Sequence, residues 1–319
     1  MHRLILGLFL LCLAMPAKAA DTDFNTWLRG MRQDAMAQGI SAATLDRALA
    51  GVQPIPRVIE LDHSQPESKL TFQQYLDRVV SQTRRDTARQ RYLDNKGLLD
   101  TIGARYGVPP RYIVALWGIE TNFGGNIGNF SVIASLATLA YDGRRAAFFR
   151  KELINALQII QTDGIDPHTM IGSWAGAMGQ SQFMPSSYLA YAVSYGGSGG
   201  PDIWNKLDDV FASIANYLSH VGWKADQRWG DTVRVPPGFD SSLAGKDQKR
   251  TIGEWAKLGV TLSDGRALQA DPQQRAFLLQ PGGSDGPSFL AYDNFNVILR
   301  WNNSSSFAVA VGYLADSVN

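Results

Sequence analysis

The first candidate for chemistry in this sequence is a single acid that interrupts an apolar helix pattern. At the spacing i, i+3, i+4 and i+7, one face of the helix predicted within residues 109–125 carries Ile113, Leu116, Trp117 and Glu120. Burial and the negative end of a helix dipole both raise a carboxyl pKa, so Glu120 is a candidate proton donor near neutral pH. The same spacing also allows Glu120 to lie at the edge of the stripe, with its carboxylate in water.

Prolines and glycines bound the helix that must position this acid. Pro109 and Pro110 suit a first helical turn, where the missing N–H of proline is not needed. Gly124 and Gly125 favour the left-handed conformation that commonly ends a helix. We therefore expect a helix of about three turns that ends just after Glu120.

Three segments of the sequence resemble one enzyme family. They are GIETNFGGNIGNFSVIASLATLAYDGRRAAFF around Glu120, GSWAGAMGQSQFMPSSYLAYA at residues 172–192, and FLAYDNFNVILRWNNSSSFAVAVGYLAD at residues 289–316. On these segments the chain is identified as a soluble, non-lipidated member of the B family of lytic murein transglycosylases. The resemblance implies a mainly α (α+β) fold with a lysozyme-like helical core.

The resemblance further implies a reaction in which one carboxyl group is first acid and then base. Glu120 matches the catalytic glutamate of the family. It would protonate the β-1,4 glycosidic oxygen between N-acetylmuramic acid (MurNAc) and N-acetylglucosamine (GlcNAc). It would then take the proton of the muramyl 6-hydroxyl, which closes a 1,6-anhydro ring without water.

Most glycosidases need a second carboxylate, and its absence or presence separates the possible reactions. The acids that could fill this place, none of which lies in a recognisable motif, are Asp142, Glu152, Asp163, Asp166 and Asp202. A hydrolytic muramidase and a non-catalytic peptidoglycan-binding or scaffold protein remain the alternatives to a transglycosylase.

Several residues match family positions that hold peptidoglycan glycan strands, the partner that the resemblance implies. Ser173 and Gln182, nine residues apart, match polar groups that bind the sugar chain. Tyr75 and Tyr217 match aromatic residues of the cleft, although both lie on apolar helical stripes and are equally compatible with core packing. Asn302 matches an asparagine of the last motif.

The sequence departs from the family pattern close to these residues. Trp301 stands where the family often has a tyrosine, and Phe307 occupies a further tyrosine position. We expect these positions to lose hydroxyl contacts while ring stacking remains. In the glycine-rich segment, Gln180 and Ser181 replace a more usual Tyr-Gly pair.

No cofactor and no metal site is expected. Some relatives have an EF-hand-like calcium loop near residues 194–204, with aspartates at alternating positions. Here Ser194, Gly196 and Ser198 occupy those positions, so charged oxygen ligands are missing. The histidines, which show no metal-ligand spacing, are His2, His63, His168 and His220.

Composition and the first 20 residues bear on location. The chain has 319 residues, 45% hydrophobic and 18% charged, with a net charge of +1, which suggests neither nucleic acid nor a membrane surface as a partner. Residues 1–20 read as a signal peptide with an apolar run and an A-x-A site, cleaved near Ala19/Ala20. Cys12 follows two leucines rather than the small residues of a lipid-attachment site. We therefore expect a soluble periplasmic protein without a membrane anchor.

The texture of the sequence suggests three folded parts after the leader. We expect an N-terminal helical domain at 21–100, a lysozyme-like catalytic core at 101–223 and 293–319, and a small inserted β-containing module at 224–292. Within the first part, prolines 54, 56 and 66 predict an extended connection. A helix is expected from Thr71, and residues 83–106 read as one longer helix that stops at Gly107.

Overall fold

The computed structural model describes residues 23–64, 70–197 and 199–318, so the predicted leader, Cys12, Pro66 and Ser198 lie outside it. The described part of the chain is mainly helical with a small sheet, and this confirms the predicted fold class. Its α-helices are α1 (Phe24–Ala37), α2 (Ala42–Leu49), α3 (Pro56–Ser64), α4 (Phe72–Val79), α5 (Gln82–Asp94), α6 (Lys96–Tyr106), α7 (Pro110–Thr121), α8 (Val132–Asp142), α9 (Ala146–Asp163), α10 (Pro185–Tyr191), α11 (Leu207–His220), α12 (Ile252–Lys257), α13 (Asp293–Trp301) and α14 (Ser305–Asp316).

The strands form two antiparallel sheets. Strands β1 (Phe130–Ser131) and β2 (Ile171–Gly172) make a short pair within the helical part. The larger sheet has the order β4-β6-β7-β3-β5. Its strands are β3 (Gly230–Arg234), β4 (Arg250–Thr251), β5 (Thr261–Leu262), β6 (Arg275–Leu279) and β7 (Ser288–Ala291).

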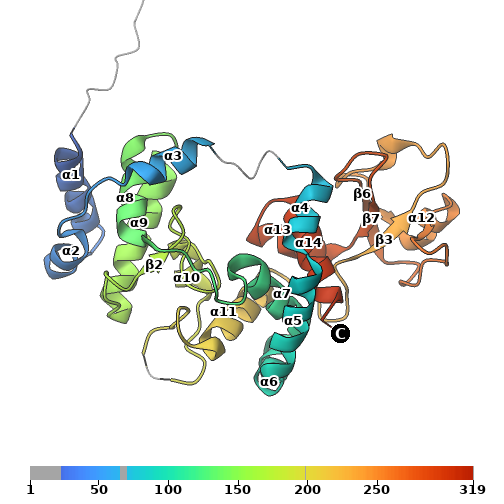
Figure 1. Cartoon of the computed structure of the whole chain (residues 1–319), viewed down its shortest axis with the longest axis horizontal. Helices are drawn as coiled ribbons and strands as arrows, with labels where there is room; N and C mark the ends of the chain where they lie inside the picture. Colours follow the sequence, from blue (N-terminus) through green and yellow to red (C-terminus); the bar gives the residue numbers. More distant parts are fainter. Residues whose placement is uncertain (1–22, 65–69, 198, 319) are drawn as a thin grey trace, which may run out of the picture.

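Helix α7, which carries Glu120, lies at the centre of the molecule. Figure 1 shows α1 and α2 at one end and the larger sheet with α12 at the other. Between them, α7 packs against α5, α6, α11 and α14, while α8 packs along α9. Of these neighbours of α7, α5, α6 and α11 precede the larger sheet in the sequence and α14 follows it. Helix α7 therefore contacts segments that are far apart in the chain.

Side-chain caps determine where several helices begin. The Ser41 hydroxyl accepts a hydrogen bond from the Thr44 N–H and so caps α2. Thr71 and Gln74 form a reciprocal capping box at the start of α4, which confirms the helix predicted there. These bonds satisfy N–H groups that have no partner inside the helix.

Strands β6 and β7 of the larger sheet have buried residues on both faces. Successive residues of a strand point to opposite sides of the sheet. On β7, Phe289 faces the helical core and packs against the rings of Trp229 and Tyr313. The next residue, Leu290, faces the opposite way and joins a smaller core around Trp255 of α12. The sheet therefore shares apolar packing with the helices, and the division into domains stays a prediction.

A glycine on α14 permits this contact between sheet and helices. A Cβ added at Gly312 would lie 2.3 Å from the ring of Trp229, which is too close for any side chain. The indole N–H of Trp229 donates to Asp316, in the last turn of the same helix, over 2.9 Å. Gly312 thus allows a large buried ring to lie directly on the helix backbone.

Two predictions about the N-terminal part were wrong. The segment predicted as an extended connection contains helix α3, because Pro56 occupies the first helical turn, where proline is tolerated, rather than breaking the chain. The single helix predicted for residues 83–106 is two helices, α5 and α6, which meet at Asn95. Gly107 ends α6 in the left-handed conformation, as expected.

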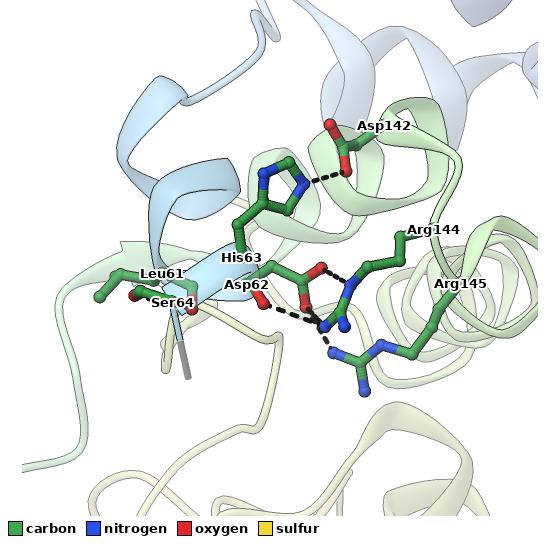
Figure 2. Close-up of polar contacts among 7 residues, drawn as sticks. All are labelled: Leu61, Asp62, His63, Ser64, Asp142, Arg144 and Arg145. Atoms are coloured by element: carbon green, nitrogen blue, oxygen red, sulfur yellow. Dashed lines mark hydrogen bonds and ion pairs between the residues drawn. The ribbon is translucent and has the colours of Figure 1, made fainter. Parts of the chain in front are cut away.

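A buried carboxylate fixes α3 to the turn between α8 and α9 (Figure 2). The side chain of Asp62 is only 1% exposed. It accepts from Arg144 Nε and Nη2 over 2.6 and 2.8 Å, and from Arg145 Nη2 over 2.6 Å. The hydrogen bonds from Arg144, together with those from Arg145, lower the pKa of Asp62 below its ordinary value. Beside it, His63 Nε2 lies 3.2 Å from Asp142 Oδ2.

We predict that Asp62→Asn lowers the free energy of unfolding by about 2–4 kcal/mol at pH 7, because it leaves two guanidinium groups without their buried partner. Since the folded pKa of Asp62 is lowered, its contribution is fully present above the unfolded pKa of about 3.9 and is lost as the pH falls through the folded pKa. Urea unfolding of both proteins at pH 7 and pH 3 measures the difference.

The matched control is Glu60→Gln, which removes an exposed ion pair with Arg57. Such pairs contribute about 0–1 kcal/mol, so this variant should unfold nearly like the wild type. Equal stability of Asp62→Asn and wild type at pH 7 would show that the ion pairs of Asp62 do not stabilise the fold. A difference in unfolding free energy between the two proteins that does not become smaller at pH 3 would also contradict the prediction.

Candidate active site

Glu120 lies in the last turn of α7 and is half-buried, while the apolar residues of its stripe are buried. The indole Nε1–H of Trp301 donates to Glu120 Oε1 over 2.7 Å. The two residues are 181 positions apart in the chain. The fold therefore brings the acid of the first motif into direct contact with the last motif.

Trp301 belongs to a cluster of aromatic rings beside Glu120. Its ring centroid lies 5.2 Å from that of Phe183 and 4.8 Å from that of Tyr217. Tyr191 packs in turn against Tyr217 at 4.7 Å. These rings come from the glycine-rich segment, α10, α11 and α13, so all three sequence motifs and α11 meet near the acid.

Tyr217 is mainly a packing residue of this cluster. It is 8% exposed, and its hydroxyl donates to the carbonyl of Arg300 over 2.6 Å. Burial raises the pKa of Tyr217 to about 12, so the hydroxyl stays protonated at neutral pH. That bond fixes the residue that precedes Trp301.

The predicted polar pair lies in the glycine-rich segment that follows β2. The Ser173 hydroxyl accepts from the Ala177 N–H over 3.1 Å and closes a turn. The Gln182 amide Nε2 donates to the carbonyls of Ile127 and Gly179, over 3.1 and 2.9 Å. Gln182 thereby ties this segment to the loop that follows α7, and its neighbour Phe183 contacts Trp301.

The two remaining predicted residues are Tyr75, which precedes these aromatic residues in the sequence, and Asn302, which follows them. Tyr75 is half-buried on α4. Burial lowers the pKa of the neighbouring Arg84, and Tyr75 opposes that shift. Asn302 is exposed directly after α13, and its carbonyl accepts from the Ser304 N–H over 2.8 Å. The binding roles of all these side chains stay predictions.

The most informative difference from the sequence-based expectation concerns Trp301. Stacking without a polar contact was expected there, because the hydroxyl of a tyrosine is missing. The structure shows that the indole N–H supplies a polar contact to the acid itself. Gln180, noted in the sequence only as a departure from the family pattern, bonds to Trp117 on α7 and is a residue that the sequence did not assign to the site.

In the region where some relatives have a calcium loop, a buried carboxylate is bonded to backbone groups. Asp209, which is 1% exposed, accepts the backbone N–H of Tyr195 and of Asp202 over 2.7 and 2.8 Å. The Ser194 hydroxyl donates to the carbonyl of Gly197 over 3.3 Å. The buried carboxylate of Asp209 therefore accepts hydrogen bonds from two backbone N–H groups of this region.

In a second group of possible metal ligands, the buried carboxylate is also already bonded to protein groups. One ligand atom each from Asp62, His63 and Asp142 lies within 4.8 Å of the others. Figure 2 shows that the Asp62 oxygens point instead at Arg144 and Arg145. A cation there would compete with two guanidinium groups for one carboxylate.

Among the helices of the described residues, none combines the length and apolar character that crossing a bilayer requires.

Comparisons with known proteins agree with the arrangement of these motifs. Residues 23–316 match the family model described as the transglycosylase SLT domain. Over 219 residues, the chain is 36% identical to the membrane-bound lytic murein transglycosylase B of Escherichia coli (strain K12). This match covers 67% of the present chain but only 58% of that relative's length.

Three crystal structures are similar to the present one. SltB3 of Pseudomonas aeruginosa in complex with NAG-NAM-pentapeptide is 46% identical with a TM-score of 0.90, covering 93% of this chain and 79% of that one. The soluble lytic transglycosylase SltB1 of the same organism is 29% identical with a TM-score of 0.80, covering 91% and 97%. Slt35 of Escherichia coli in complex with calcium is 28% identical with a TM-score of 0.78, covering 91% and 92%.

Proposed function

Since the chain belongs to the SLT-domain family of lytic transglycosylases, we propose that it is an exported enzyme that cleaves peptidoglycan through Glu120. The proposed reaction breaks the β-1,4 bond between MurNAc and GlcNAc and leaves a 1,6-anhydro-MurNAc end. The substrate class is supported by the relative SltB3, whose structure holds NAG-NAM-pentapeptide. The single observation that carries the proposal is the contact between Trp301 and Glu120.

The chemistry of that contact suits a carboxyl group that gives up a proton and later takes one. An indole N–H can donate a hydrogen bond but cannot accept one. Glu120 Oε1 therefore accepts from Trp301 in both protonation states, and the transferable proton resides on Oε2. In the proposed cycle, Oε2–H protonates the glycosidic oxygen, and Oε2 then takes the proton of the muramyl 6-hydroxyl as its oxygen attacks C1.

The surroundings of the other acids support a mechanism with one carboxylate. Asp142 lies beside His63, and Asp163 accepts from the Tyr188 hydroxyl over 2.9 Å. Glu152 accepts from the Ser186 N–H over 2.8 Å. Asp166 and Asp202 each accept from backbone N–H groups of their own turns. Each candidate for a second carboxylate thus serves a local structural contact.

We predict that Glu120→Gln reduces cleavage by on the order of 10³-fold or more, because glutamine keeps the shape of the side chain but can neither donate nor accept the proton. Purified sacculi and mass spectrometry of the released muropeptides provide the assay. The wild type should release ends lighter by one water than hydrolytic products. The matched control is Glu254→Gln, which retains the capping box of α12 and should leave cleavage unchanged.

The other outcomes distinguish the alternatives. Reducing ends that react with borohydride would show that water attacks, which makes the protein a muramidase. Binding of sacculi by the wild type without any release of muropeptides would favour a scaffold protein. Full activity of Glu120→Gln would show that the catalytic residue is another one.

Export to the periplasm is a further part of the proposal. Its support is the apolar run before Ala17-Lys18-Ala19 and the action of the relatives on murein. Mass spectrometry of the protein from envelope fractions should find a mature N-terminus near Ala20. A diacylated Cys12 at the N-terminus, or an uncleaved chain, would contradict this.

A further inference from the structure

The carboxamide of Gln180 joins the helix of Glu120 to a distant loop. Its Oε1 accepts from the indole Nε1–H of Trp117 over 2.8 Å, and its Nε2 donates to the carbonyl of Trp204 over 2.8 Å. The backbone of Gln180 does the same, because its N–H donates to the Ile203 carbonyl and its carbonyl accepts from the Thr121 hydroxyl, over 2.8 and 3.0 Å. One residue thus makes two bonds to α7 and two to the 203–204 segment.

The two residues of α7 that Gln180 contacts lie on either side of Glu120. Trp117 is one helical turn before the acid, and Thr121 follows it directly. The Thr121 hydroxyl also accepts from the Gly124 N–H over 3.1 Å. Gln180 therefore contacts one face of the last turn of α7, at residues that precede and follow Glu120 in sequence.

This end of α7 is strained and depends on its contacts. Asn122, Phe123 and Gly124 have φ angles of 50°, 59° and 80°, so two residues other than glycine adopt the left-handed conformation. Such residues cost about 1–3 kcal/mol each and persist only where the surroundings hold them. A Cβ added at Gly124 would lie 2.3 Å from Gln180 Oε1, so the amide packs directly against the turn.

The far side of the amide is also held firmly. The indole Nε1–H of Trp204 donates to the carbonyl of Ile171 in β2 over 2.8 Å. Asp202 accepts from the N–H groups of Trp204 and Asn205, over 3.1 and 3.0 Å. Gln180 therefore connects α7 to a segment that is bonded to the rest of the site.

We propose that Gln180 is a positioning residue for Glu120: it fixes the last turn of α7 so that the carboxylate stays in contact with Trp301. Gln180 acts on the acid through Trp117 and Thr121 rather than on the substrate. The inference rests on the proposed function of Glu120. Its consequence is that loss of the amide lowers the rate of the chemical step, since small displacements of a reacting group cost on the order of 10²-fold.

The test is Gln180→Met, which keeps the length of the side chain but removes both side-chain hydrogen bonds. With soluble peptidoglycan glycan strands, kcat should fall on the order of 10–100-fold while KM changes by less than about threefold. Trp117→Phe, which removes the donor to Oε1 together with part of a buried ring, should lower kcat in the same direction. The double variant should lose less than the product of the two single effects, because both substitutions remove the same hydrogen bond between Trp117 and Gln180.

The matched control is Gln161→Met. The Gln161 amide likewise accepts from a backbone N–H, that of Ser41 over 2.7 Å, and donates to a carbonyl, that of Gly39 over 3.0 Å. It bridges α9 to α2, and Gln161→Met should lower the melting temperature without changing kcat. A general loss of packing would lower kcat equally in both variants and so would overturn the proposal.

Other results separate this inference from the proposed function. Wild-type kcat in Gln180→Met, or a raised KM with unchanged kcat, overturns the positioning role while leaving Glu120 as the acid. Full activity of Glu120→Gln overturns the proposed function first. If Gln180→Met does not fold, Trp117→Phe alone decides, since wild-type kcat in that folded variant contradicts the proposal.

Discussion

The hydrogen bond from the Trp301 indole to Glu120 depends on nearly every part of the helical core. It needs α7 to end at the acid, α13 to end at the indole, and α14 to pack on both of these helices. The larger sheet lies between α11 and α13 in sequence, and its Phe289 face packs into the same core. The geometry of one carboxyl group thus depends on segments from both ends of the chain.

The acid is held from two directions by groups with different chemistry. The indole N–H of Trp301, which can donate a hydrogen bond but cannot accept one, contacts Oε1 of Glu120 directly. Through the backbone of the helix, the Gln180 amide and the Thr121 hydroxyl connect the strained end of α7 to the loop at residues 203–204. In the proposed reaction the same oxygen gives and receives the proton, so a fixed carboxylate serves both steps without a second acid.

Local signals in the sequence predicted much of this arrangement. Pro110 begins α7 and the helix ends just after Glu120, as expected, and Thr71 caps α4. The left-handed conformation, however, is already adopted by Asn122 and Phe123, before the predicted Gly124. The prediction failed at residue types that are compatible with two different local structures. Pro56 begins a helix instead of breaking the chain, and Asn95 ends α5 while it also precedes α6.

Partners that are distant in sequence were beyond such reasoning. The pattern placed Glu120 on an apolar face, but no spacing rule pairs it with a tryptophan 181 residues away. In the sequence, Gln180 could be recognised only as a departure from the family pattern. Its structural role depends on four hydrogen bonds to two segments that are distant in the chain. Likewise, nothing local reveals that the buried Asp209 accepts the backbone N–H groups of Tyr195 and Asp202.

The most direct test of the central claim, that the muramyl 6-hydroxyl rather than water attacks C1, is cleavage of sacculi in H₂¹⁸O. Mass spectrometry would follow the muropeptides released by the wild-type protein. The account predicts 1,6-anhydro ends that contain no ¹⁸O, because both oxygens at the new ring come from the substrate. One ¹⁸O at C1 of the released muramic acid would contradict it, since water would then be the attacking group.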